Sequence, residues 1–239
     1  KFIIRFAKKK DDGSVVQVPG NEVLTKLESL TGEILLFLTY IKNLYWVDNT
    51  TGKFARIALS EVDKDKNLIT CRMEGTAYGE KEEISRYLKY RKVFDHPDMK
   101  NAEVSVAYKV NNRANNINEM SNTDIWVYFP TRDNTELPFL VHGSFETAVS
   151  REKLMTPSAF NDSLFDEIGN LIADSLADLK NRQMITQVFI RRVLLGAFKD
   201  EEKNHTIPGL KEKVSQKFLE CAYLPDRDGE YQSVADLFM

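Results

Sequence analysis

The chain has 239 residues, of which 42% are hydrophobic and 29% are charged, and its formal net charge at pH 7 is -3. This composition is typical of a globular chain with one large or two small domains. The weak negative charge excludes a strong overall attraction to nucleic acid or to anionic membranes. No apolar run is long enough to cross a bilayer. The two cysteines, Cys71 and Cys221, show neither metal-ligand spacing nor a disulfide framework, so we expect a cytoplasmic protein without a metal site.

The sequence opens inside an apolar, strand-like block, residues 1–7, and we therefore expect the chain to be a segment of a longer protein. Residues 15–18 extend this block as a hairpin. An amphipathic helix should follow the Pro19-Gly20-Asn21 breaker and end at Gly32. Residues 34–38 are uniformly apolar, which predicts a buried helical turn.

Three strands are expected next, over residues 45–48, 53–59 and 67–74. The sequence Asn49-Thr50-Thr51-Gly52 between the first two is a hairpin turn signal. The composition of residues 81–91 favours a helix, which the run Asp95-His96-Pro97-Asp98 would end.

The central part of the chain predicts the rest of a sheet. Residues 103–110 alternate between apolar and polar, as a half-exposed antiparallel strand does. Residues 111–123 are polar and asparagine-rich and predict a long loop. Residues 124–129 are apolar on both faces, so we expect them centrally in the sheet, paired with residues 137–142 after a turn over residues 131–136.

The clearest helix covers residues 158–179, where apolar side chains recur every three or four residues. Thr156 should cap it, with Pro157 as its first residue. Helices over residues 185–198 and 210–219, a short strand over 221–224 and a turn over 226–229 complete the chain. Together these elements predict an α+β fold: a mixed or antiparallel sheet, helices mainly on one face, and a small C-terminal helical portion.

One basic residue stands at a position suited to phosphate chemistry. Arg151 belongs to the run Ser150-Arg151-Glu152-Lys153-Leu154, between the last predicted strand and the long helix. The simple interpretation of this spacing is a plain strand-to-helix connection, with Glu152 near the positive end of the helix dipole. The functional interpretation is a guanidinium that binds the γ-phosphate of a nucleotide held by another domain. The chain contains neither G-x-x-x-x-G-K-[ST] nor G-x-G-x-x-G nor D-x-G-x-G, so it should not bind ATP well by itself.

Two other candidate sites have simpler interpretations. His142 ends an apolar block without a nucleophile or carboxylate placed beside it by sequence, and a strand-end histidine is the simpler interpretation. Asp226, Asp228 and Glu230 resemble part of a calcium loop but lack its spacing and closing glutamate, so we interpret them as a turn.

Three blocks of the sequence resemble a known group of ATPases. The run around Arg151, followed by an amphipathic helix, resembles the heat-shock protein 90 middle domain, in which an S-R-E-x-L run opens such a helix and its arginine contacts the ATP γ-phosphate. Residues 128–131 and 137–145 look like paired strand motifs of sacsin-type ATPases. Residues 1–6 are similar to the last strand of the shared ATPase fold, and residues 34–38 to its connector.

The resemblance implies a domain division and a site. Residues 1–45 would be the C-terminal remnant of a GHKL-type ATPase domain with its connector, residues 46–198 a middle, transducer-like domain, and residues 199–239 the start of a C-terminal helical segment. It implies that Arg151 is catalytic and that Arg151 and Ser150 contact the nucleotide. Met155 stands where the heat-shock motif has glutamine, and Glu152 where sacsin-type proteins often have a second arginine. Both departures bear on the strength of ATP hydrolysis and not on the fold.

The implied function is to couple ATP hydrolysis to a chaperone-like or remodelling activity. ATP and Mg²⁺ would be cofactors of the full-length protein, and this segment alone would bind neither. The expected partners are the upstream ATPase domain of the same chain and a client protein, with a homodimer of the full-length protein left open; a membrane and a nucleic acid are not expected. The alternative is a non-catalytic module that binds protein or nucleic acid on a related fold. A basic stripe involving Arg86, Lys89, Arg91 and Lys92 would favour nucleic acid.

Overall fold

The computed structural model describes residues 7–9, 15–17, 20–61, 67–79, 82–121, 123–135, 137–198, 207–226 and 228–234. Of the strand predicted over residues 1–7, only Ala7 is described. It begins β1 (Ala7–Lys9), which pairs with β2 (Val15–Gln17) as an antiparallel hairpin, and this confirms the hairpin predicted there.

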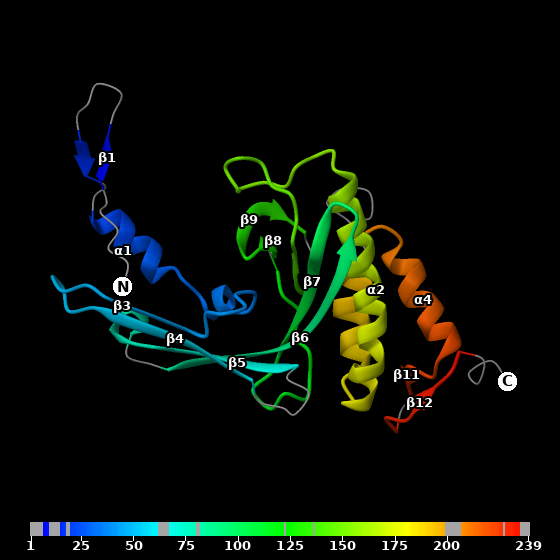
Figure 1. Cartoon of the computed structure of the whole chain (residues 1–239). Helices are drawn as coiled ribbons and strands as arrows, with labels where there is room; N and C mark the ends of the chain where they lie inside the picture. The colour runs from blue at the N-terminus through cyan, green and yellow to red at the C-terminus, as the bar shows by residue number, and fades with distance from the viewer. Residues whose placement is uncertain are drawn as a thin grey trace.

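The centre of the molecule is an eight-stranded sheet with the order β3-β4-β5-β6-β7-β10-β8-β9 (Figure 1). All neighbouring strands are antiparallel except β10 and β8, which are parallel. The strands are β3 (Asn43–Val47), β4 (Phe54–Glu61), β5 (Leu68–Glu74), β6 (Glu83–His96), β7 (Met99–Val110), β8 (Asp124–Val127), β9 (Phe129–Asn134) and β10 (Leu140–Gly143).

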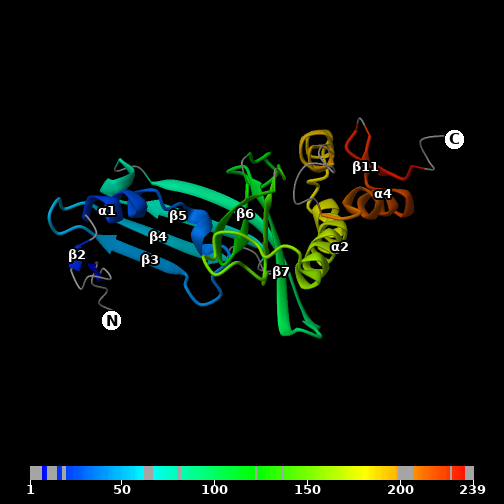
Figure 2. The ribbon, with the colours of Figure 1, turned by 90° about the horizontal axis from the view of Figure 1, so that it is seen from above.

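Helices cover this sheet on both faces, and the longest ones share one face. They are α1 (Gly20–Glu28), η1 (Gly32–Leu35), η2 (Thr76–Tyr78), α2 (Ala159–Asn181), η3 (Phe189–Leu194), α3 (Leu195–Ala197) and α4 (Leu210–Glu220). A short hairpin of β11 (Leu224–Pro225) and β12 (Tyr231–Gln232) follows α4. The predicted α+β class is therefore confirmed. Seen from above, the molecule is elongated, with β3–β5 at one end and α2 and α4 at the other (Figure 2).

Two hydrophobic cores lie on opposite faces of the sheet. Val104, Val106 and Tyr108 of β7 pack with Leu164 and Ile168 of α2 in the larger core. The smaller core lies under η1 and contains Leu35, Phe37, Trp126 and Ala107. The prediction that residues 103–110 are half-exposed was therefore wrong, because Glu103, Ser105 and Ala107 on the second face are buried as well, and Ala107 belongs to the core under η1.

The helix predicted over residues 81–91 was also wrong, because β6 occupies this region and extends to His96. The charged composition suggested a helix, but Tyr87 and Leu88 are fully buried on opposite faces of the sheet, as successive residues of a strand are. The run Asp95-His96-Pro97-Asp98 contributes to the turn between β6 and β7 and does not end a helix.

The region after residue 124 differs from its prediction in three details. Residues 131–136 were expected to form a turn, whereas β9 continues through Asn134 and forms one edge of the sheet. β10 does pair with β8, as predicted, but in parallel, because β9 first reverses the chain. Ser158, and not Thr156, caps α2: its Oγ accepts a hydrogen bond from the Asn161 N–H, and Pro157 lies before the helix.

Candidate functional site

Arg151 lies at the tip of a loop that connects β10 to α2. The loop narrows at an antiparallel bridge between Thr147 and Leu154. Within it the Ala148 N–H donates to the Lys153 carbonyl (2.9 Å), and the Arg151 N–H donates to the Ala148 carbonyl (2.8 Å). The loop of residues 147–154, called here the arginine loop, is therefore a hydrogen-bonded turn and not an open connection.

The arginine loop is held by strand β9. The Leu154 N–H donates to Asp133 Oδ2 (2.6 Å), and the Arg132 N–H donates to the Glu152 carbonyl (2.7 Å). Leu154 itself is buried in the larger core, at 7% exposure. The backbone of the loop is therefore hydrogen-bonded to the edge strand β9, and the side chain of Leu154 anchors the loop in the larger core.

Asn161, in the first turn of α2, holds the base of the loop on the other side. Its side-chain amide donates to the carbonyls of Glu146 (3.0 Å) and Met155 (3.1 Å), and its Oδ1 accepts from the Glu146 N–H (2.8 Å). Asn161 is only 3% exposed, so these bonds are shielded from water. The two chain segments that enter and leave the arginine loop are thereby fixed to the start of α2.

The tip of the arginine loop is exposed and carries the cationic side chain of Arg151. Val149, Ser150 and Arg151 are all exposed, and Val149 is fully so. Glu152, the neighbouring carboxylate, pairs with Arg132 (Nη2 to Oε1, 3.0 Å) and not with Arg151. Within the described residues Arg151 makes no ion pair, so its guanidinium is open to an anionic ligand.

The backbone of Arg151 has an unusual conformation. Its φ is +57°, in the left-handed region that only a few per cent of residues other than glycine adopt. Such a conformation costs about 1–2 kcal/mol for a residue with a side chain. The hydrogen-bonded turn therefore determines the direction in which the Arg151 side chain projects from the loop.

His142 is at the end of β10, as expected, but it belongs to the interior. It is 0% exposed, stacks on Phe37 (centroids 4.8 Å apart) and meets the edge of the Tyr128 ring. Neither ring nitrogen has a hydrogen-bond partner among the described residues. Burial lowers the pKa of His142 from 6.5 to about 3; the charge of Glu103 opposes this shift, while Lys89 and Arg91 add to it. The residue is a neutral core histidine at pH 7.

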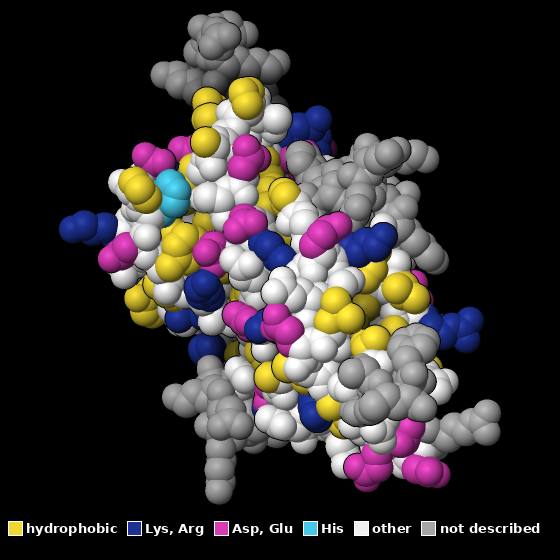
Figure 3. All heavy atoms as spheres, turned by 90° about the vertical axis from the view of Figure 1, so that its right-hand side faces the viewer, with side chains coloured by type: hydrophobic (Ala, Val, Ile, Leu, Met, Phe, Trp, Pro, Cys, Tyr) yellow, Lys and Arg dark blue, Asp and Glu magenta, His cyan; other side chains and the backbone are white. Residues whose placement is uncertain are grey.

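The basic residues of β6 do not form a stripe. Arg86 and Lys92 alternate with Lys89 and Arg91 along the strand, so the two pairs point to opposite faces. Arg91 pairs with Glu103, and Lys92 pairs with Glu167. Figure 3 shows acidic and basic side chains interspersed on the side of the molecule that carries α4, where Lys213 and Lys217 pair with Asp166 and Asp174.

The other sequence candidates give no site. Asp226 accepts hydrogen bonds from the N–H groups of Asp228 and Glu230, which confirms the predicted turn. Among the residues described, no group of three or more His, Cys, Asp or Glu side chains is placed to hold a metal ion. None of the described helices is both long and apolar enough to span a membrane.

The sequence interpretation missed the residues that build the arginine loop. Asn161 lies within the helix predicted over residues 158–179, and Arg132 and Asp133 lie within the turn predicted over residues 131–136. A carboxylate and an asparagine that bond to a distant loop leave no spacing signal in a single sequence.

No protein family, curated protein or solved structure matches this chain.

Proposed function

We propose that this chain is the middle segment of a heat-shock-protein-90-like or sacsin-like ATPase. In the full-length protein the arginine loop would bring Arg151 to the γ-phosphate of ATP, with Ser150 beside it. ATP and Mg²⁺ would be held by an upstream domain, and this segment alone would bind neither.

The observation that carries this proposal is that Arg151, on a hydrogen-bonded loop, makes no ion pair with any residue that the structure describes. An arginine presents a planar set of donors that matches the oxygens of a phosphate. Its effect on a transition state depends on being held in place before the reaction. Hydrogen bonds to Asp133 and Asn161 hold the loop in place. The ion pair of Glu152 with Arg132 leaves the Arg151 guanidinium available for a phosphate.

The connection of the loop to α2 supports a coupling role. Asn161 is hydrogen-bonded to residues 146 and 155, so a displacement of either residue would be transmitted to α2. Helix α2 in turn packs against both β7 and α4. A nucleotide that draws Arg151 toward it would therefore act on the larger core. This is the route by which ATP state would reach a chaperone-like or remodelling activity on a client protein.

The proposal is tested in the full-length protein with Arg151→Ala. An arginine supplied to a γ-phosphate contributes roughly 10³–10⁵ in rate, equivalent to about 4–7 kcal/mol. We expect the rate of ATP turnover to decrease by a factor within this range. The Kd for ATP should change little, because the upstream domain holds the nucleotide.

Arg113→Ala is the matched control, since Arg113 is an exposed arginine in the loop after β7. It should leave turnover unchanged. If Arg151→Ala also leaves turnover unchanged, the segment is better described as a non-catalytic module that binds another protein, for which the exposed Val149 would be a contact.

A further inference from the structure

Strand β3 forms one edge of the sheet, and no described residue is paired with its outer side in the sheet. β3 pairs with β4, and no described strand pairs with its other side. The five residues Asn43-Leu44-Tyr45-Trp46-Val47 contain no charge and no proline. Natural proteins usually protect an edge strand with charges, prolines or covering loops. β3 has neither a charge nor a proline, and no described strand covers its outer side.

The opposite edge is protected by the same criteria. β9 carries Pro130, which has no N–H, and the charged residues Arg132 and Asp133. The arginine loop also covers part of this edge, because the Arg132 N–H is bonded to the Glu152 carbonyl. Of the two edge strands, β9 therefore has a proline, charges and a covering loop, whereas β3 has neither charge nor proline.

The hydrogen bonds at the ends of β3 identify its free peptide groups. The Asp48 N–H donates to the Lys53 carbonyl (2.8 Å), and the Leu59 N–H donates to the Lys42 carbonyl (2.8 Å). Because hydrogen-bonded positions alternate in an antiparallel pair, the peptide groups of residues 42, 44, 46 and 48 face β4. Those of Asn43, Tyr45 and Val47 point outward.

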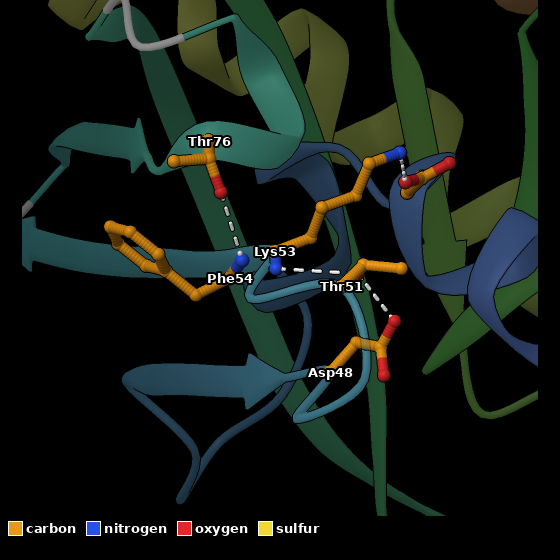
Figure 4. A network of polar contacts seen from close by, with 6 residues as sticks. Asp48, Thr51, Lys53, Phe54 and Thr76 are labelled. Carbon is orange, nitrogen blue, oxygen red and sulfur yellow. Dashed lines mark hydrogen bonds and ion pairs between the residues drawn. The ribbon is translucent and has the colours of Figure 1, made fainter.

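Hydrogen bonds join the end of β3 to the turn that follows it, as Figure 4 shows. The Asp48 carboxylate accepts hydrogen bonds from Thr51 Oγ1 and from the Thr50 N–H, which fixes the turn to β4. These bonds also lower the pKa of Asp48, so its carboxylate is charged at neutral pH. The edge is therefore a fixed template with an acidic end at Asp48 and a basic end at Lys42.

The side chains near this edge are unusually apolar for a surface. Tyr45 is 63% exposed and Val47 is 46% exposed. Tyr40 and Ile41, just before the strand, and Phe54, opposite Val47, are exposed as well. A patch of this kind is typical of an interaction surface.

We propose that β3 pairs with β3 of a second copy of the chain, antiparallel and centred on Tyr45. In this register Asn43 faces Val47 and Tyr45 faces Tyr45, so every outward N–H and C=O group of the three residues finds a partner. The same register places Lys42 opposite Asp48, and Leu44 opposite Trp46. A shift of the centre to residue 44 or 46 leaves outward groups unpaired and sets a charged residue opposite an apolar one. The two sheets then continue as one across the dimer, independently of the proposed ATPase function.

Sedimentation velocity over a range of about 1–100 μM, the affinity range of a modest interface, tests the dimer. We expect wild-type chain to form a species of twice 27.5 kDa. Tyr45→Lys places like charges side by side on the two-fold axis and should raise the dimer Kd at least about tenfold. Phe129→Lys, on the exposed side of β9, adds the same charge and should leave the Kd unchanged.

Cysteine cross-linking tests the register. Tyr45→Cys brings two thiols opposite each other on the axis, within reach of a disulfide, and should cross-link under mild oxidation. Val47→Cys should not, because in this register Val47 faces Asn43. Cys71 and Cys221 are present in both variants, so their background is the same. A wild-type chain that stays monomeric throughout the concentration range overturns the proposal. So does a dimer unaffected by Tyr45→Lys, or cross-linking at Val47→Cys in place of Tyr45→Cys.

Discussion

At the scale of single residues, Arg151 combines exposure with an enforced backbone conformation. A left-handed φ at a residue with a side chain is most often found where the surrounding structure over-determines it. The sequence identified Arg151 as a candidate but gave no sign of this conformation. Its placement depends on Ala148, Asp133 and Glu152, which lie in other parts of the loop or in another strand.

The conformation of Arg151 leads to a prediction about stability. Arg151→Gly and Arg151→Ala both remove the guanidinium, but only glycine adopts a φ of +57° without steric cost. We expect the glycine variant to be more stable than the alanine variant by about 1 kcal/mol. Urea unfolding of the two variants measures this difference, and equal midpoints would contradict the left-handed assignment.

His142 predicts how stability depends on pH. Its folded pKa, about 3, is below the value of 6.5 expected for the unfolded chain. As pH falls below 6.5 the unfolded state therefore binds a proton first, and the stability that His142 contributes is lost progressively toward pH 3. The loss approaches about 1.4 kcal/mol per pH unit.

The measurement is the free energy of unfolding in urea between pH 7 and pH 5, for wild type and for His142→Leu. Subtracting one profile from the other removes the contribution of every other titrating group. We expect wild type to lose more stability than His142→Leu over this interval. Parallel profiles would show that the histidine is accessible to protons in the folded state.

At the scale of elements, the clamp made by Asn161 joins the arginine loop to α2. Asn161→Ala removes three hydrogen bonds to Glu146 and Met155 and should cost about 1–3 kcal/mol of stability. The amides of Ala148 and Arg151, which are hydrogen-bonded in the loop, should then exchange faster with deuterium.

Asn170→Ala is the matched control for this clamp. Asn170 lies on the same helix and is half-buried, but it does not contact the arginine loop through any hydrogen bond given by the structure. Its replacement should leave loop exchange unchanged. Equal exchange in the Asn161 variant and wild type would mean that β9 alone holds the loop.

The elements also show which sequence signals are informative. Apolar periodicity correctly predicted the helix of residues 158–179 and the strands β3, β4 and β5. Composition misled at residues 81–91, because it does not show that Tyr87 and Leu88 are buried on opposite faces of a sheet or that Arg91 pairs with Glu103 of the neighbouring strand. Alternation over residues 103–110 indicated a strand but not that both its faces are covered. At Ala107 the second face is covered by the core under η1, which lies more than sixty positions earlier in the chain.

At the scale of the whole molecule, the α+β class follows from the order of strands and helices, but the strand order does not. The insertion of β10 between β7 and β8 joins segments far apart in sequence. The candidate site has the same property, since it combines the loop after β10, the edge strand β9 and the start of α2. A single sequence named the arginine, and only the fold supplied the residues that hold it.

The two proposals concern opposite edges of the sheet. The β9 edge carries the arginine loop, and the β3 edge carries the proposed self-pairing surface. An ATPase domain that engages Arg151 would therefore leave the β3 edge of this sheet open to a second copy. The two proposals stand on different residues and are tested by different variants.

The most direct test of the central claim is the rate at which bound ATP is cleaved in a single turnover of the full-length protein. Steady-state turnover is often limited by conformational steps, whereas a single turnover with enzyme in excess reports on cleavage itself. We predict that Arg151→Ala lowers this rate constant by on the order of 10³ or more, with the fraction of ATP bound unchanged. A rate constant equal to that of wild type would contradict the account.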